Sequence, residues 1–445
     1  MFKPIKKITI ATVIGASLML PLEVAHAQAT PAEISALQVQ MKALQAQIDA
    51  LTSQQQATQK EVATVGKNVV TRTPAGDLLI GDTTLSIGGY IKAQATVSNN
   101  GFSNGKASEI VSPGALRSVN SNQGSRTSMS ARESRFNIGT STPVFGDTLK
   151  TFVELDFYGS DNQANEYVSN SYGPRLRHAY GSWGKWLAGQ TWSTFMDLNG
   201  LGEIDAFGQH ASAIFVRQTQ LRYTQPFAGG SLQFALENPE DGGDPTLVLS
   251  NSGNLVARDS KGDDQSVPDI IGRVNFDGSW GHASVAAMAR KLSLDDGTAK
   301  DSKWGDAYSV TGRFPTFGKD DIRLQANYGN LGRYMGLLAY PDAVVVDGGT
   351  ANGNIDGIDA WGLSAIYRHY WTDSLRSSLT YSQTGLDSSG TANMTDSYDS
   401  AFINLMWTPI TNTTLAIEYQ RFKLEEVDGD NFDLNRMQVS AKYDF

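Results

Sequence analysis

Apolar and polar residues alternate in short segments from Thr83 to the end of the chain. In the first segment, Leu85, Ile87 and Ile91 share one phase, and Lys92 and Gln94 share the other. A period of two predicts β-strands, because successive side chains of a strand point to opposite faces. Segments of this kind occur at 85–95, 131–140, 149–157, 174–183, 185–193, 214–225, 232–236, 270–276, 283–289, 308–314, 322–328, 361–367, 374–384, 403–407, 415–419 and 437–445. The pattern therefore predicts sixteen strands, an even number that would suit a closed antiparallel barrel.

The connections between these segments alternate between short and long. Short ones at 142–146, 225–229, 277–281 and 407–410 carry turn-forming residues. Long ones at 99–130, 239–267 and 329–357 are rich in Gly, Asn, Ser and Asp. Short turns on the periplasmic side and long loops outside are typical of outer-membrane barrels. We therefore expect an all-β transmembrane barrel of about sixteen antiparallel strands, wide enough to leave an aqueous channel.

The last residues of the chain form a strictly alternating strand. Its apolar face carries Met437, Val439, Ala441, Tyr443 and Phe445, and its other face is polar throughout. It resembles the closing strand of bacterial outer-membrane barrels, in which the terminal aromatic residue is the assembly signal. The resemblance implies that Phe445 and Tyr443 have this role and that the chain meets the outer-membrane assembly machinery.

The N-terminus has the features of a secretory signal peptide. Lys3, Lys6 and Lys7 precede an apolar run over 8–22, and Ala25-His26-Ala27 is a small-residue cleavage site. The run is short for a membrane-spanning helix, although an uncleaved anchor is the alternative. We expect a signal peptide over 1–27 and a mature chain that begins at Gln28.

A heptad pattern separates this signal from the first strand. Its apolar positions, spaced three and four residues apart, begin with Ile34, Leu37, Met41, Leu44, Ile48 and Leu51 and continue to Val69. This spacing predicts the core of a coiled coil, and Ile at a with Leu at d favours a dimer. We expect a periplasmic coiled-coil segment and linker over 28–75, followed by the barrel domain over 76–445. A solvated amphipathic spacer is the alternative.

Composition excludes several classes of protein. The 445 residues contain no cysteine, so there is neither a disulfide framework nor a thiolate metal site. Without Lys3, Lys6, Lys7 and Glu23, the 36 basic and 46 acidic residues become 33 and 45, and the charge changes from −10 to −12, which argues against nucleic acid as a partner. The histidines of the mature chain are scattered, so we expect no enzyme, catalytic residue or cofactor. The Asn352–Gly357 segment and the acidic residues of 425–433 are interpreted as solvated loops rather than metal sites.

Basic residues fall on the polar phase of the predicted strands. They are Lys92, Arg135, Lys150, Arg175, Arg177, Arg222, Arg273, Arg290, Arg313, Arg323, Arg368, Arg376 and Arg436. Arginine facing lipid costs about 2–4 kcal/mol at mid-membrane, so these charges should line the lumen. Such a wall favours passage of small anions, since arginine binds carboxylates bidentately. Carboxylates on the same phase, such as Glu133 and Glu154, leave open that the arginines only shape a field.

The segment after the fifth predicted strand is too long for a hairpin. It carries Asp197, Glu203 and Asp205, with aromatic residues able to anchor it. It resembles the third loop of general porins, which folds into the lumen and makes the constriction. We expect its acids to face Arg135, Arg175 and Arg177 across the opening. The alternative is an external loop that covers the centre of a trimer.

Taken together, the chain resembles the DcaP-like porins over essentially its whole mature length. The most specific part comprises Arg175-Leu-Arg177-His-Ala-Tyr180 and Gly189-Gln-Thr-Trp-Ser-Thr-Phe-Met-Asp197, supported by the terminal Tyr443-Asp-Phe445. The resemblance implies a homotrimer in the outer membrane, in contact with lipid and lipopolysaccharide, and uptake of small anionic solutes such as dicarboxylates. The alternative hypothesis is a plugged-barrel anchor whose coiled coil tethers the outer membrane to the cell wall or to a periplasmic partner.

Overall fold

The computed structural model describes residues 30–67, 70–73, 76–102, 109–120, 124–159, 172–239, 248–249, 255–256, 267–295, 300–335, 342–346, 354–387 and 395–445. The chain divides into two units, Met1–Val69 and Val70–Phe445. The predicted signal peptide lies outside the described residues. The boundaries predicted at 27 and 75 remain predictions.

The first unit contains one long helix, α1 (Pro31–Lys67). Pro31 suits the first helical position because its ring already has the helical φ angle and its missing N–H is not needed there. The heptad positions Met41, Leu44, Ile48 and Leu51 are all exposed, by 50–68%, whereas the side chains of Ile34 and Leu37 lie outside the described set. The helix is therefore confirmed, and its assembly into a coiled coil remains a prediction. No helix among the described residues is long and apolar enough to cross a membrane.

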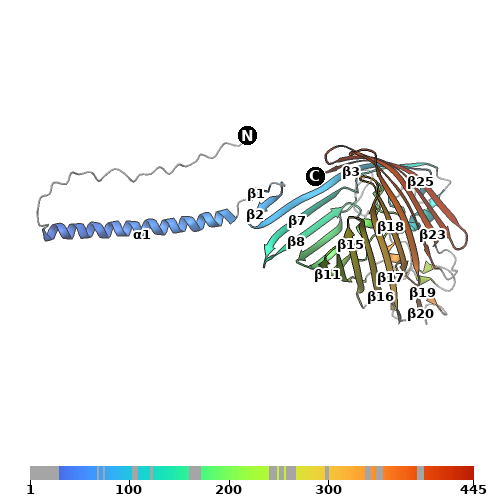
Figure 1. The fold of residues 1–445 in the computed structure, drawn as a ribbon, viewed down its shortest axis with the longest axis horizontal. Helices are drawn as coiled ribbons and strands as arrows, with labels where there is room; N and C mark the ends of the chain where they lie inside the picture. The colour runs from blue at the N-terminus through green and yellow to red at the C-terminus, as the bar shows by residue number, and fades with distance from the viewer. Residues whose placement is uncertain are drawn as a thin grey trace. The chain divides into compact units, whose positions relative to one another are not determined.

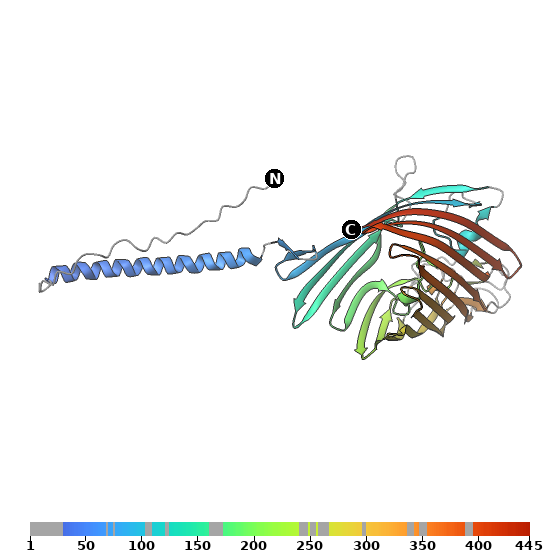
Figure 2. The same ribbon diagram turned by 45° about the horizontal axis from the view of Figure 1, so that its top comes forward.

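The second unit is a closed antiparallel barrel of sixteen strands (Figures 1 and 2). The strands are β3 (Thr83–Ser98), β7 (Arg135–Val144), β8 (Asp147–Asp156), β9 (Arg175–Trp183), β10 (Trp186–Trp192), β11 (Arg217–Phe227), β12 (Gly230–Glu237), β15 (Asp269–Gly278), β16 (Gly281–Asp295), β17 (Lys300–Pro315), β18 (Asp321–Gly329), β21 (Ala360–Tyr370), β22 (Leu375–Leu386), β23 (Thr395–Ile410), β24 (Thr413–Glu426) and β25 (Asn431–Asp444). Each pairs with its neighbour in this order, and β25 pairs with β3 to close the barrel. The terminal Phe445 extends this seam, because its amide and carbonyl both bond Gly89, at 3.0 and 3.2 Å.

Further short strands and helices lie outside the sixteen barrel strands. The hairpin of β1 (Val70–Arg72) and β2 (Leu78–Ile80) pairs with the start of β3, and β6 (Arg126–Ser130) pairs with its far half. Two-strand ribbons are formed by β4 (Gly101–Phe102) with β5 (Val119–Asn120), β13 (Val248–Leu249) with β14 (Leu255–Val256), and β19 (Ala343–Val346) with β20 (Asn354–Gly357). The short helices are α2 (Pro113–Arg117), η3 (Leu198–Gly200) and η4 (Gly332–Tyr334). They lie in the long connections.

The two faces of the sheet separate apolar from polar side chains as the alternation predicted. Ile91 is 61% exposed on the outer face, and its neighbour Lys92 is 4% exposed on the inner face. The same holds for the exposed Val310 and the buried Thr311 of β17. Apolar side chains left on the outside of a barrel are stable only against lipid. The predicted strand phases are therefore confirmed.

Turn length distinguishes the two ends of the barrel. The connections predicted to be short, at 142–146, 225–229, 277–281 and 407–410, all lie at the end where β3 starts and β25 finishes, which we call the short-turn end. In the turn between β7 and β8, Phe145 and Gly146 have φ angles of 51° and 81°. Both values match the tight hairpin turns in which the two central residues have positive φ. The opposite end is the long-loop end.

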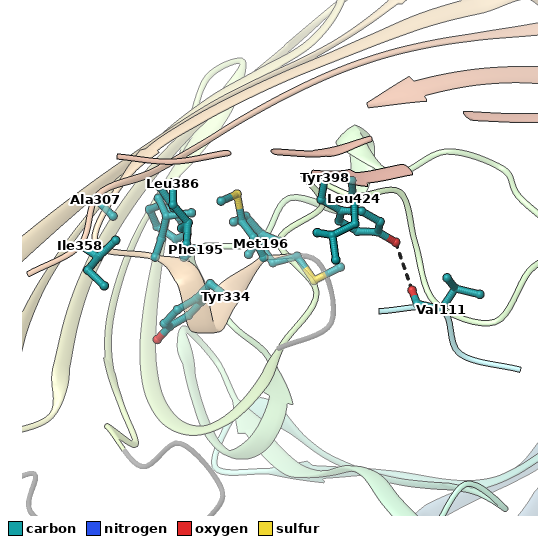
Figure 3. Packing of buried hydrophobic residues seen from close by; sticks show 14 of the residues in the cluster. Val111, Phe195, Met196, Ala307, Tyr334, Ile358, Leu386, Tyr398 and Leu424 are labelled. Carbon is teal, nitrogen blue, oxygen red and sulfur yellow. Dashed lines mark hydrogen bonds between the residues drawn. The ribbon is translucent and has the colours of Figure 1, made fainter. Parts of the chain in front are cut away.

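Parts of three long connections fold into the barrel and form a core there. From the first connection, this core includes Phe102 and Leu116. Figure 3 shows its members Phe195 and Met196, from the connection between β10 and β11, and Tyr334, from the connection between β18 and β21. The connections at 99–130 and 329–357 lie at the long-loop end, opposite the short turns. The sequence did not predict that parts of them fold inward, where their apolar side chains bury area against the inner side of the barrel wall.

Candidate channel interior

The connection between β10 and β11, residues 193–216, runs through the inside of the barrel and is called the inner loop. The amides of Ala211 and Ser212 donate to the hydroxyls of Ser400 on β23 and Ser382 on β22, both at 2.8 Å. From β18, Asn327 donates to the carbonyl of Ser212 at 2.9 Å. These bonds reach inward-facing side chains on the wall, so the alternative of an external loop does not hold. Whether the loop sets the width of the channel remains a prediction.

Asp197 fixes the first part of the inner loop. Its carboxylate accepts hydrogen bonds from Ser284 at 2.6 Å and from the backbone amide of Asn199 at 2.9 Å, and it also contacts His282 at 2.7 Å. Burial raises the pKa of Asp197, but the hydrogen bonds from Ser284 and Asn199 outweigh burial and hold the pKa below its usual value. The ionised carboxylate is therefore a stable anchor of the loop on β16.

Glu203 fixes the middle of the loop to β21 and β22. Arg376 on β22 donates to its carboxylate at 2.8 Å, and Arg368 on β21 does so at 3.3 Å. Burial raises the pKa of Glu203, but the hydrogen bond and charge of Arg376 and the charge of Arg368 outweigh it, so the pKa lies below its usual value. The carbonyl of Glu203 also accepts from Asn404 at 2.7 Å.

Asp205 fixes the loop close to the barrel seam. Its carboxylate contacts Lys92 at 3.2 Å, Ser440 at 2.7 Å and Gln438 at 2.8 Å. Its backbone amide and that of the next residue both donate to Glu418, at 2.6 and 2.9 Å. The carboxylates of the three acids are thus anchors with partners of their own on the wall. The expectation that they face Arg135, Arg175 and Arg177 across the opening was wrong.

Arg175 and Arg177 instead form a compact ion cluster on the wall near the long-loop end. Arg175 binds Asp156 with two nitrogens, at 3.0 and 2.7 Å, and Arg177 binds Glu154 and Asp156 at 2.7 Å each. Arg135 lies 3.9 Å from Glu154. A register shift between β8 and β9 places consecutive residues 177 and 178 on the inner side. Such a bulge had no signal in the alternation.

A second cluster lies near the short-turn end. Arg323 binds Asp321 at 2.7 Å and donates to the carbonyl of Leu201 in the inner loop at 2.6 Å. Arg313 contacts Asp321 at 3.2 Å, and Arg368 binds the same carboxylate. Together with Arg376, four arginines share the carboxylates of Asp321 and Glu203, which leaves the cluster positively charged.

Two of the predicted lining residues differ from those of the clusters in their ion pairing. Arg222 on β11 and Arg273 on β15 have no carboxylate within ion-pair distance among the described residues, although Arg273 donates to the carbonyl of Met196. The two strands flank β12, where Arg222 is opposite Ala235 and Arg273 is opposite Gln233. Both side chains are half-buried and lie on the inner phase of their strands, so their charges face the barrel interior with no carboxylate within ion-pair distance among the described residues.

Sequence reasoning missed Arg217 because it starts β11 on the outward phase. In the structure its guanidinium stacks on the ring of Trp192 at 3.5 Å and donates to His178 at 3.3 Å. The aromatic residue at the end of the preceding strand was the only available signal.

Of the acidic residues, only Glu426, Asp428 and Asp430 lie close enough together to hold a metal ion within the described part of the chain. Glu426 is paired with Arg117.

Comparisons with known proteins agree with this architecture. The crystal structure of the outer membrane channel DcaP of Acinetobacter baumannii superimposes with a TM-score of 0.69 and 21% identity, covering 84% of this chain and 99% of that one. The anion-selective porin from Comamonas acidovorans has a TM-score of 0.51 and 13% identity, covering 82% of this chain and all of that one. Porin Omp2b of Brucella suis is 32% identical over 163 residues, which are 35% of this chain and 42% of that protein. The matched region is therefore less than half the length of this relative.

Residues 79–443 match the family described as the porin subfamily, which accounts for nearly the whole barrel unit. The resemblance to DcaP-like porins is confirmed by the similarity of fold. Family and fold are those of an outer-membrane channel rather than an enzyme. The chain belongs to the porin subfamily.

Proposed function

We propose that the protein is a trimeric pore for passive uptake of small hydrophilic anions, with dicarboxylates as its preferred class of solute. The observation that carries this proposal is the pair Arg222 and Arg273, whose charges have no carboxylate partner among the described residues. A charge that the protein leaves unpaired in a water-filled lumen concentrates ions of opposite sign. A paired charge largely loses this effect.

The placement of these two arginines suits a solute with two carboxylates. They project from strands on either side of β12, two residues apart in register. Strands lie about 4.8 Å apart, so the two backbones are about 10 Å from each other, and the long side chains allow a smaller gap between guanidinium groups. Each guanidinium offers a rigid fork of donors to one carboxylate.

The ion clusters above and below add to this preference. The cluster around Arg177 holds Arg135, Arg175 and Arg177 against Glu154 and Asp156, an excess of one positive charge. The cluster around Asp321 has four arginines against two carboxylates, an excess of two. An anion crossing the barrel would therefore meet positive potential at successive heights. The porin of Comamonas acidovorans, described as anion-selective, shares the fold.

Support for the trimer comes from two observations. One similar structure is the trimer form of OmpT from Vibrio cholerae, with a TM-score of 0.50 and 12% identity. The exposed heptad stripe of α1 needs partner helices to be buried. Attachment to three barrels would impose a three-stranded coiled coil in spite of the dimer preference of its sequence. The plugged-anchor alternative is not favoured, because family and fold are those of channels.

The test is the reversal potential of single channels in planar bilayers under a salt gradient. Wild-type protein should show anion preference, and the double variant Arg222→Gln/Arg273→Gln should lose most of it. The control is Arg421→Gln, because Arg421 is exposed on the outer phase of β24, and it should keep wild-type selectivity. Succinate should reduce the chloride current of the wild type more than that of the double variant. Cation preference of the wild type, or unchanged selectivity of the double variant, would contradict the proposal.

A further inference from the structure

A second segment inside the barrel contacts the inner loop near both of its ends. This segment, residues 330–335 between β18 and β21, is called the brace. Met335 forms an isolated antiparallel bridge with Ile214, and the amide of Phe215 donates to the carbonyl of Tyr334 at 3.0 Å. On the other limb, the ring of Phe195 meets that of Tyr334 edge-on, with centroids 6.0 Å apart (Figure 3). The brace therefore joins the start and the end of the inner loop.

The brace is itself fixed by a buried ion network. Arg333 in the brace binds Asp269 on β15 at 2.8 Å, and Tyr334 donates to the same carboxylate at 2.7 Å. Arg290 on β16 binds Asp342 at 3.0 Å, and Asp342 accepts from the backbone amide of Arg333 at 3.1 Å. All five side chains are buried. Burying charges is costly, and a network that surrounds one short segment defines the position of that segment.

The strand behind the brace leaves room for it. A Cβ atom on Gly362 of β21 would lie 2.7 Å from Cβ of Ser212 in the inner loop and 2.8 Å from Sδ of Met335. The inner loop, the brace and the wall thus meet where the wall has no side chain. Close approach of this kind requires glycine. The brace, the loop and β21 form one packed unit rather than three surfaces that happen to touch.

We propose that the brace is a positioning element that restricts the motion of the inner loop and so keeps the rate of brief current closures low. This inference rests on the proposed function as a pore and on the predicted role of the inner loop in narrowing it. The residues of the brace are buried, so they do not touch the solute, and they act through the loop. Weakening the ion network should let the loop fluctuate, because Met335 and Tyr334 would no longer be fixed against its two limbs.

The test uses Asp342→Asn, which preserves shape but removes the charge that binds Arg290. The rate of brief current closures should rise about tenfold, the factor that corresponds to loss of one charge-assisted hydrogen bond. The matched control is Asp356→Asn, which removes an exposed ion pair with Lys303 in the same connection. It should leave the closure rate unchanged. If Asp342→Asn does not fold, Tyr334→Phe removes only the hydrogen bond to Asp269 and takes its place.

A disulfide provides the rescue that a purely structural role would not show. The chain has no cysteine, so Ile214→Cys with Met335→Cys introduces a single pair, at positions whose antiparallel bridge suits disulfide geometry. In the Asp342→Asn background, oxidation should return the closure rate to that of the wild type, and reduction should raise it again. A pair that does not oxidise, or an Asp342→Asn channel as steady as the wild type, overturns the inference. Ion selectivity is measured separately from the closure rate. A failure of the proposed anion preference can therefore be distinguished from a failure of the inference about the brace.

Discussion

Replacing Arg177 by alanine should destabilise the barrel far more than it changes ion selectivity. Arg177 is 1% exposed and donates to Glu154 and Asp156, each at 2.7 Å. Its loss leaves Glu154 with Arg135 at 3.9 Å and His178 at 4.0 Å, while Asp156 keeps both of its bonds to Arg175. Breaking a buried ion pair from one side costs about 3–5 kcal/mol. Because one carboxylate stays paired, we expect about 3 kcal/mol.

The assay is equilibrium unfolding by urea or guanidinium in lipid vesicles, extrapolated linearly to zero denaturant. Arg222→Ala is the matched control, since no described carboxylate loses a partner, and it should change the unfolding free energy by less than about 1 kcal/mol. The double variant Arg177→Ala/Glu154→Ala should recover part of the loss, because the buried carboxylate is gone. The reasoning is refuted if the unfolding free energy of Arg177→Ala lies within about 1 kcal/mol of the wild-type value. It is also refuted if Arg177→Ala and Arg222→Ala are equally destabilised.

Three further predictions follow from the anchors and the helix. The carboxylate of Glu418 accepts hydrogen bonds from two backbone amides of the inner loop, and Glu418→Gln leaves only one acceptor oxygen for them. Limited proteolysis of the folded protein should therefore cut this loop faster in the variant; an unchanged cutting rate would argue against the anchor. The pKa of Glu203 lies below its usual value of 4.5 because Arg376 outweighs burial, so its stabilisation is complete above pH 4.5 and is lost as the pH falls through the lower, folded-state value. The difference in unfolding free energy between the wild type and Glu203→Gln should therefore stay constant from pH 7 to 4.5, and a change of this difference above pH 4.5 would contradict the reasoning. Leu44→Asp with Leu51→Asp should lower the fraction of full-length protein that chemical crosslinking captures as a trimer, without changing the conductance of a single barrel; an unchanged trimer fraction would favour the solvated spacer.

The sequence predicted the number and phase of the strands because lipid on the outside forces strict alternation. It predicted their ends less well. The strand predicted at 283–289 extends from Gly281 to Asp295, and the one predicted at 308–314 begins at Lys300. Beyond the apolar band both faces of a strand meet water or loops, so the alternation that reveals the strand disappears. Hydrogen bonding between neighbours nevertheless continues, since all fourteen pairs from 282 with 313 to 295 with 300 remain in register.

Pairing inside the lumen could not be predicted for a different reason. Glu203 meets Arg376 across 173 residues of sequence, and Asp205 meets Ser440 across 235. Such contacts depend on the path of the inner loop and on the diameter of the barrel, neither of which leaves a local pattern. The brace was missed on the same grounds, because Tyr334 and Met335 lie in a connection whose composition resembles a solvated loop. The direction of Arg222 and Arg273 was predictable from phase alone, whereas the lack of a carboxylate partner for them among the described residues was not.

The inner arginines therefore divide by partner rather than by position on the strands. An arginine held by a buried carboxylate, such as Arg177, contributes to stability, and its field in the lumen is largely cancelled at the distance of a passing ion. An arginine without such a partner, such as Arg222, contributes little to stability and keeps its field. Ion selectivity should consequently follow the count of unpaired charges rather than the total of thirteen predicted basic lining positions. A variant that removes a carboxylate partner, for example Glu154→Gln, should then lose stability and gain anion preference at once.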